Sequence, residues 1–194
     1  MSEPICKVAD IIYVRFELAE FEEQKKYFDH FGLMLAYEDE NSIFFRGSGT
    51  APYAYVATKG KENKYIGTAY KANEYSDLEA LSKEFNVDIV ENKEPGGGHK
   101  VTVIDPDGIE VEVCHGMTPA EPIAVVSKVL NTGQSKQREN ELQRFGKAAD
   151  EWQVEGDKWV YKLKSNVKRL GHTAINCRDA VSYTHLTLPT TYHV

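Results

Sequence analysis

One order of secondary structure occurs twice in the first 115 residues, and this repeat constrains the fold more than any other feature of the sequence. The first copy begins at residues 7–18, where apolar and polar side chains alternate as in a half-buried strand. A helix pattern follows, and Gly32 stands where a left-handed residue would end that helix. Three short strand candidates complete the copy: Met34–Glu38, Ser42–Arg46 and Tyr53–Thr58.

The second copy keeps the same order. Tyr65–Lys71 is strand-like, and Ser76-Asp-Leu-Glu79 fits a capping box that would open a helix. The DPDG sequence at 105–108 predicts a tight hairpin turn between the last two strands. Three strand candidates follow the helix: Val87–Glu91, Lys100–Ile104 and Ile109–Cys114. The repeat therefore predicts an α+β fold, a paired βαβββ half-barrel module over residues 7–115.

Alternation in the first strand also predicts which side chains face which way. The apolar positions Val8, Ile12, Val14 and Phe16 share one face, which we expect to pack on the core. Tyr13 and Arg15 then lie on the opposite face, toward a cleft in the module. Side chains of this size would fill the cleft, as expected for a cavity that takes no part in catalysis.

Charge and composition exclude several classes of function. The net charge is −7 and Lys and Arg do not gather in a basic stripe, so we expect no nucleic-acid partner. No run of roughly 18 apolar residues predicts a membrane span, and the N-terminus lacks a signal-peptide pattern. Three widely spaced cysteines suggest neither a disulfide framework nor a zinc site. We therefore expect a cytoplasmic protein.

The repeat pattern weakens after residue 115. Residues 116–166 are polar and contain Pro119 and Pro122, which predicts a linker, although strand character returns at Trp159–Leu163. Residues 167–180, which include VKRLGHTAINCRD, read as the first strand of a further module, with strand character over Lys168–Cys177. Residues 181–194 contain no Asp, Glu, Lys or Arg, and we interpret them as a non-native tail.

These motifs together resemble the vicinal oxygen chelate superfamily, which includes glyoxalases, bleomycin resistance proteins and extradiol dioxygenases. The resemblance rests on the paired pattern, on DPDGIEVEV at 105–113 and on VKRLGHTAINCRD at 167–179. It is closest to two-domain type I extradiol ring-cleavage dioxygenases, as a chain truncated early in its second module. The resemblance implies an oxidoreductase in which Fe(II) cleaves a catechol-type aromatic ring with O₂. It also implies a homo-oligomer.

The resemblance places metal ligands on three strands of one module: two histidines and a glutamate after the DPDG turn. In the first module the corresponding positions are Ile11, Gly67 and Glu112, so only the carboxylate is present. One carboxylate without imidazole is a poor transition-metal site. We therefore expect the first module to be structural and to bind no metal.

In the second module the resemblance assigns one metal ligand, His172. Alternation along the predicted strand places His172 on the face of Ala174 and Asn176, toward a cleft. The other two ligands would lie beyond the end of this sequence. We therefore expect this chain to be inactive, with no catalytic residue, no cofactor-binding residue and no bound iron.

The remaining histidines suggest no site. His30 falls at the end of the first helix, where its charge would favour the helix dipole. The other four histidines are His99, which follows three glycines, His115, His185 and His193. Their spacing does not support a metal triad with Glu112.

Two other functions stay open at this stage. Proteins with βαβββ modules can bind flat aromatic ligands without metal, and the residues that could line such a cleft are Tyr13, Tyr53, Tyr55 and Tyr70. Alternatively, the chain is a partner subunit or pseudo-enzyme, because an unpaired strand at 168–177 would offer an edge for pairing with another chain.

Overall fold

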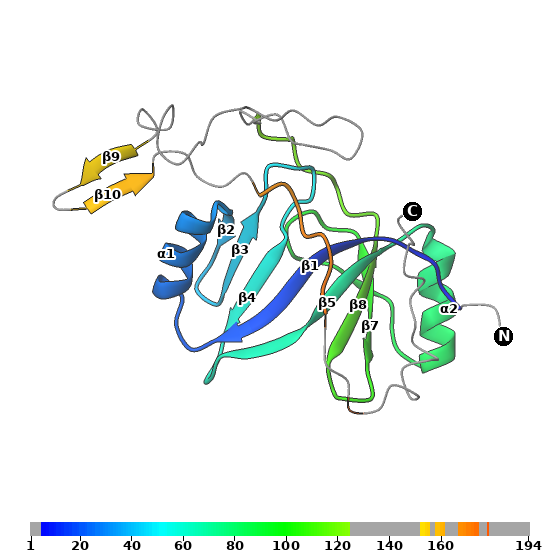
Figure 1. The fold of residues 1–194 in the computed structure, drawn as a ribbon. Coiled ribbons are helices and arrows are strands. Elements are labelled where there is room, and N and C mark those ends of the chain that lie inside the picture. The colour runs from blue at the N-terminus through cyan, green and yellow to red at the C-terminus, as the bar shows by residue number, and fades with distance from the viewer. Residues whose placement is uncertain (1–4, 125–151, 156–157, 162–166, 175–177, 179–194) are drawn as a thin grey trace.

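The computed structural model describes residues 5–124, 152–155, 158–161, 167–174 and 178 (Figure 1). Its first and largest part contains eight strands and two helices. In chain order these are β1 (Val8–Leu18), α1 (Glu22–Phe31), β2 (Met34–Glu38), β3 (Ser42–Arg46), β4 (Tyr55–Lys59), β5 (Lys64–Ala72), α2 (Tyr75–Phe85), β6 (Val90–Glu91), β7 (His99–Ile104) and β8 (Glu110–His115).

These strands form one mixed sheet built from two equivalent halves. Its strand order is β2-β3-β4-β1-β5-β8-β7-β6, so each half contributes four neighbouring strands. The two parallel pairs, β1 with β4 and β5 with β8, occupy equivalent places in the halves. The antiparallel pair β1–β5 joins the halves at the centre. The predicted α+β fold with a paired βαβββ module is confirmed.

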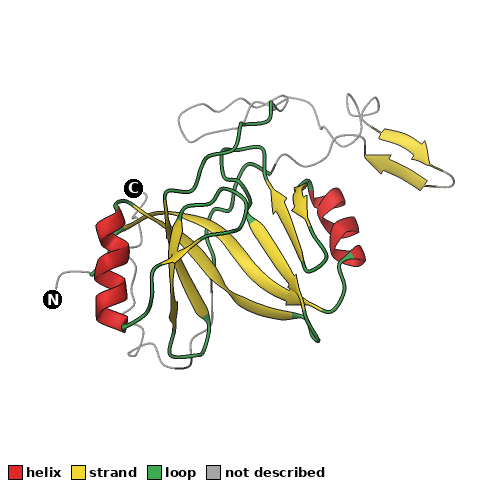
Figure 2. Ribbon diagram, turned by 180° about the vertical axis from the view of Figure 1, so that it is seen from behind, coloured by secondary structure: helices red, strands yellow, loops and turns green. Residues whose placement is uncertain are grey.

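The two helices cover the same kind of face in each half, and they lie at opposite ends of the sheet (Figures 1 and 2). Phe28 of α1 packs in a cluster with Ile43, Phe45 and other residues of β3 and β4. Leu78 and Leu81 of α2 pack in the other half, against valines of β7 and β8. Burial of these apolar side chains is the main contribution to the stability of each half.

A third cluster packs on the face of the sheet that carries neither helix. Its buried members come from both halves and are Ile12, Tyr13, Phe44, Tyr53, Val56, Ala69 and Cys114. We call this side of the sheet the inner face. It is the face toward which Tyr13 was predicted to point.

Irregularities in β1 alter the predicted division of its side chains. The pairing of β1 with β5 shifts register between Ile11 and Tyr13. Ile12 therefore packs in the inner-face cluster, whereas Val14 and Phe16 pack on the side of α1. The prediction of one shared apolar face was wrong for Ile12, because a β-bulge breaks the period-two alternation.

The helix ends confirm one predicted signal and correct another. Gly32 ends α1 with φ 95°, and its N–H donates to the carbonyl of Phe28, as expected. The capping box predicted at Ser76 is wrong, because α2 begins earlier. Glu74 is the N-cap, and its N–H donates to the side chain of Asp77 at 3.0 Å.

Most predicted strands form, with shifts at their ends. Tyr53–Thr58 was predicted where β4 covers Tyr55–Lys59, and of Val87–Glu91 only Val90–Glu91 is a strand. The DPDG turn forms as predicted. Its Gly108 has φ 83°, and the side chain of Asp105 accepts the N–H groups of Asp107 and Ile109.

The predicted linker contains a hairpin. Strand β9 (Trp152–Glu155) pairs antiparallel with β10 (Lys158–Tyr161). The strand expected at Trp159–Leu163 is thus present with shifted ends, while its partner at residues 152–155 was not predicted. The remaining linker residues beyond 124 and the tail 181–194 lie outside the described residues.

The segment 167–174 contains no strand, contrary to the prediction, and the rest of the predicted strand, residues 175–177, lies outside the described residues. The segment rests on the first module through its backbone: the carbonyls of Val167 and Lys168 accept the N–H groups of Ser48 and Gly49, each at 2.9 Å. A Cβ added at Gly47 would lie 2.4 Å from the carbonyl oxygen of Lys168, so glycine permits this approach. The free strand edge expected at residues 168–177 is therefore absent from the described residues 168–174, which form no strand.

Among the residues that the structure describes, no helix is long and apolar enough to cross a membrane.

Candidate functional site

The inner face is organised around one row of residues that crosses the centre of the sheet. Tyr13 of β1 lies opposite Ala69 of β5, and Ala69 lies opposite Glu112 of β8. Side chains in one such row point to the same side of a sheet. Of the three positions assigned as metal ligands in the first module, only Glu112 carries a ligand side chain, and the row places it beside a tyrosine and an alanine.

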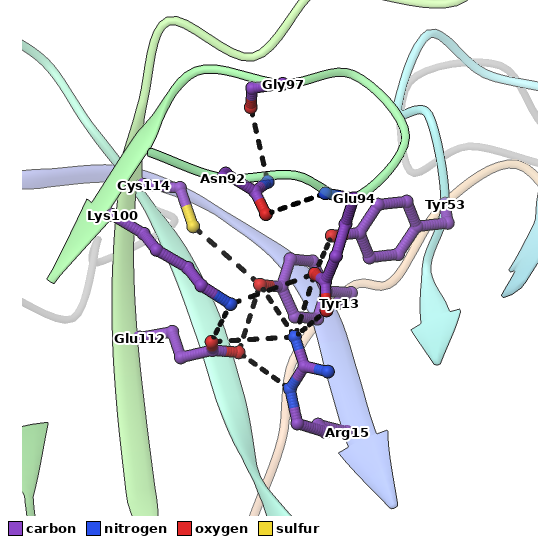
Figure 3. A network of polar contacts seen from close by, with 9 residues as sticks. All are labelled: Tyr13, Arg15, Tyr53, Asn92, Glu94, Gly97, Lys100, Glu112 and Cys114. Atoms are coloured by element: carbon purple, nitrogen blue, oxygen red, sulfur yellow. Dashed lines mark hydrogen bonds and ion pairs between the residues drawn. The ribbon is translucent and has the colours of Figure 1, made fainter. Parts of the chain in front are cut away.

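Glu112 is buried and its carboxylate is fully engaged (Figure 3). It accepts hydrogen bonds from the hydroxyl of Tyr13 and from Nε of Arg15, both at 3.0 Å. Lys100 of β7 donates a third hydrogen bond to its other oxygen. These three donors satisfy both carboxylate oxygens.

A second carboxylate, Glu94, completes the network from the loop between β6 and β7. One Nη of Arg15 lies 2.8 Å from Glu94 Oε1, and the hydroxyl of Tyr53 donates to Oε2 at 2.7 Å. Lys100 Nζ lies 3.8 Å from the same oxygen. The N–H of Glu94 donates to the side chain of Asn92, which is itself buried, so the loop holds Glu94 in place. We call these residues the inner-face network: Tyr13, Arg15, Tyr53, Glu94, Lys100 and Glu112.

The charges of the inner-face network balance, because two carboxylates face two cations. Burial alone would raise the pKa of Glu112, but the charges and hydrogen bonds of Arg15 and Lys100 hold that pKa below its usual value. Burial would lower the pKa of Arg15, yet Glu112 and Glu94 raise it above its ordinary value. Both partners therefore stay ionised at neutral pH.

The network also contains no activated nucleophile. Burial, followed by the nearby Cys114, raises the pKa of Tyr13. Burial raises the pKa of the Cys114 thiol to about 12, and the Glu112 charge adds to this shift. Since a thiol reacts as its thiolate, we expect Cys114 to react slowly in the folded protein at neutral pH.

The described residues do not fit Fe(II) at the inner face. The other two positions assigned from the sequence do not lie in the row of Glu112: Ile11 lies opposite Tyr70, before the register shift in β1. Gly67 faces Glu110, two pairs away from the row. The residues that do share the row with Glu112 offer no imidazole, and the carboxylate is held by two cations. Within the described part of the chain, no group of three His, Cys, Asp or Glu side chains could hold a metal ion.

His172 is exposed and lies in a segment without strand structure. The strand geometry that was expected to aim it at a cleft is therefore absent around it. Its neighbour Ala174 is also exposed, while Asn176 lies outside the described residues. The structure does not bring His172 together with other metal-binding side chains among the described residues.

The other histidines behave largely as expected. His30 lies in the last turn of α1. His99 and His115 face each other across β7 and β8, and the ring of Tyr75 contacts both. His115 lies three positions after Glu112 on β8, so the two side chains point to opposite faces and form no common site. His185 and His193 lie outside the described residues.

The four tyrosines considered for an aromatic cleft do not share one site. Tyr13 and Tyr53 are buried in the inner-face cluster, with ring centroids 4.6 Å apart. Tyr55 packs on the other face, against Phe16 and Phe28 of the α1 cluster. The prediction of one cleft lined by all four is therefore wrong.

Sequence reasoning identified Tyr13, Arg15 and Glu112 but missed two members of the network, Glu94 and Lys100. A signal for Lys100 was available, because the DPDG turn fixes the register of β7 and β8. That register pairs Lys100 with Cys114, which puts its side chain on the face of Glu112. Glu94 lies in an irregular loop, and no periodicity could have assigned it.

Comparison with solved structures shows what this arrangement is similar to. The Mn(II)-bound glyoxalase from Novosphingobium aromaticivorans matches with a TM-score of 0.56 and 24% identity, over 62% of this chain and 43% of that chain. Homoprotocatechuate 2,3-dioxygenase from Brevibacterium fuscum, in complex with 3,4-dihydroxyphenylacetate, matches with a TM-score of 0.56 and 21% identity, over 62% and 40%. The homoprotocatechuate 2,3-dioxygenase from Arthrobacter globiformis gives 0.55 and 23%, over 63% and 41%.

No protein-family model and no curated protein sequence matches the chain. The matched region spans less than half of each of these solved chains. At this level of identity the likeness concerns the fold. The chain has the paired βαβββ fold of the glyoxalase and the extradiol dioxygenases that it matches.

Proposed function

We propose that residues 7–115 are the structural, non-metal-binding module of a protein of the extradiol dioxygenase type. In such a protein Fe(II) and O₂ would open a catechol-type ring in a second module. Residues 167–180 would begin that module, and His172 would be its first metal ligand. The 194-residue chain itself would not cleave catechols.

The observation that carries this proposal is the state of Glu112. Its carboxylate occupies the position that a metal-binding module needs for its acidic ligand. Here that carboxylate accepts hydrogen bonds from Tyr13, Arg15 and Lys100. A divalent cation would have to displace two positive charges that already neutralise the site, and it would find no nitrogen donor in the same row. Ion pairing thus replaces metal binding at this face.

A metal titration tests the proposal. The protein is loaded anaerobically with Fe(II), desalted and analysed for iron, and catechol cleavage is followed by the absorbance of the ring-opened product. We expect substoichiometric iron and no cleavage. The control variant Glu112→Gln should leave the iron content unchanged. One equivalent of retained iron that is lost in Glu112→Gln would contradict the structural role of this module, and catechol turnover would contradict the inactivity of the chain.

A second variant tests why the inner face would bind no stoichiometric iron. Arg15→Ala with Lys100→Ala removes both cations and leaves Glu112 without charged partners. Because imidazole donors are still missing from the row, we expect no stoichiometric iron in this variant either. Iron binding that appears only here would mean that the cations alone block a latent metal site.

A further inference from the structure

A cavity of about 410 Å³, wide open to solvent, lies beside α1, on the face of the sheet opposite the inner-face network. Pockets for small organic ligands begin at roughly 300 Å³, so this volume suits a single ring with one or two substituents. Aromatic side chains from β1, α1, β4 and β5 form most of its wall: Phe16, Tyr27, Phe28, Tyr55 and Tyr65.

The aromatic wall is fixed by contacts among its own rings. Phe16 stacks on Tyr55 with centroids 5.2 Å apart and meets Tyr65 edge to face at 5.3 Å. Phe28 meets Tyr55 edge to face at 4.5 Å. Rings held in this way form a preorganised apolar surface, and a flat aromatic ligand gains both area burial and ring contacts there.

Tyr55 brings a polar atom with no partner into this apolar wall. The residue is only 7% exposed, and its hydroxyl makes no hydrogen bond within the described part of the chain. Every fully buried side-chain nitrogen or oxygen among the described residues has a partner. The Tyr55 hydroxyl must therefore reach accessible space, and the cavity that Tyr55 lines is that space. Burial raises the pKa of Tyr55, so the hydroxyl remains a donor at neutral pH.

Apart from Leu18, the rest of the lining is polar and carries one positive charge. Gln24, Asn63 and Lys64 complete the wall. The side-chain oxygen of Asn63 already accepts the N–H of Ala19, which leaves its NH₂ group as a donor. All three polar residues can thus donate hydrogen bonds, and Lys64 adds charge. This combination favours an anionic group on the ligand.

We propose that the cavity binds a single-ring aromatic carboxylate. The ring would lie against Phe16 and Tyr65, a polar substituent would bond the Tyr55 hydroxyl, and the carboxylate would face Lys64. The inference does not rest on the proposed function, since no residue of the inner-face network lines this cavity. It names a binding site on the helix-bearing face.

Titration with 4-hydroxybenzoate, followed by NMR of the ¹⁵N-labelled protein, tests the proposal. We expect saturable chemical-shift changes confined to the lining residues. The changes should be weaker with benzyl alcohol, which lacks the charge, and with cyclohexanecarboxylate, which lacks the flat ring. Tyr55→Phe keeps the aromatic wall and should weaken binding by about three- to tenfold, the effect of one hydrogen bond. Lys64→Met should remove the preference for the carboxylate over benzyl alcohol.

Tyr37→Phe is the matched control, because Tyr37 is an exposed tyrosine on β2 that does not line the cavity. It should leave the affinity unchanged. The proposal is wrong if 4-hydroxybenzoate causes no saturable shifts, if the shifts map to the inner face, or if Tyr55→Phe and Lys64→Met bind as the unmodified protein does. None of these results would bear on the iron content measured for the inner face.

Discussion

Arg15 of β1 and Glu112 of β8 meet across β5, with Nε of Arg15 3.0 Å from Oε2 of Glu112. The side chains are 11% and 4% exposed, so the pair is shielded from water. It joins the two halves of the sheet by a charged contact, next to the apolar inner-face cluster. A buried pair of this kind makes each charge dependent on the other.

Arg15→Met should destabilise the protein strongly. The substitution keeps much of the side-chain volume but leaves Glu112 and Glu94 to share the single cation Lys100. Breaking a buried ion pair from one side costs about 3 kcal/mol or more, and urea unfolding measures it. Lys25→Met, which removes the exposed pairs with Glu22 and Glu38, is the control and should leave the unfolding midpoint nearly unchanged. Equal stability of Arg15→Met and the unmodified protein would show that the pair contributes little.

Glu112 should make the protein less stable as the pH falls. Its pKa in the folded state is held below the ordinary value of 4.5 by Arg15 and Lys100, which outweigh the burial that raises it. A depressed pKa gives stability that is fully present above the unfolded-state pKa and is lost as the pH falls through the folded-state pKa. The difference in unfolding free energy between the unmodified protein and Glu112→Gln should therefore shrink between pH 7 and pH 3.

Glu110 is a control, because its pKa is shifted in the opposite direction from that of Glu112. Burial, and then the charge of Glu112, raise the pKa of Glu110 in the folded state. Its protonation on acidification therefore favours the folded protein. Glu110→Gln should remove this gain in unfolding free energy as the pH falls. Parallel pH curves for Glu110→Gln and Glu112→Gln would contradict the opposite assignments of the two carboxyls.

The sequence predicted those parts of the fold that depend on local signals. Alternation located the strands, Gly32 ended α1, and the DPDG turn fixed the last hairpin, because each signal acts within a few residues. The bulge between Ile11 and Tyr13 has no such local signal. It changes the side of the sheet on which Ile12 lies relative to Val14, as one extra residue in a strand does.

The candidate site was predictable only in part for a related reason. Tyr13 and Arg15 lie between two register shifts of β1, where alternation still holds, and Glu112 lies on the regular strand β8. Local alternation could therefore place them. Glu94 reaches the network from a loop whose path depends on three glycines with positive φ and on Asn92. Residues 167–168 likewise pack on the 47–49 loop through backbone hydrogen bonds between residues far apart in the sequence. Local patterns do not report contacts of this kind.

Gly67→Ala should disrupt the centre of the sheet. A Cβ at this position would lie 2.0 Å from the carbonyl oxygen of Glu110, so β5 and β8 would have to separate. Forcing extra atoms into a closely packed place typically costs about 1–3 kcal/mol, and we expect the upper end of this range because backbone must move. Gly171→Ala is the matched control, because its Cβ would meet nothing within 4 Å. Thermal unfolding should separate the two, and a stable Gly67→Ala protein would show that β5 and β8 can move apart easily.

The thiols should report whether the inner face opens in solution. Cys6 and Cys114 are buried, and burial raises their pKa values to about 11 and about 12. At pH 8 only about one Cys6 thiol in a thousand and one Cys114 thiol in ten thousand would be ionised, in addition to the steric protection. In a Cys177→Ser background, a thiol reagent should therefore label the native protein very slowly and label both cysteines at once in denaturant. Cys114→Ser identifies the contribution of the inner face. Fast labelling of Cys114 under native conditions would mean that the network around Glu112 opens readily, and its closed state could then no longer explain the exclusion of metal.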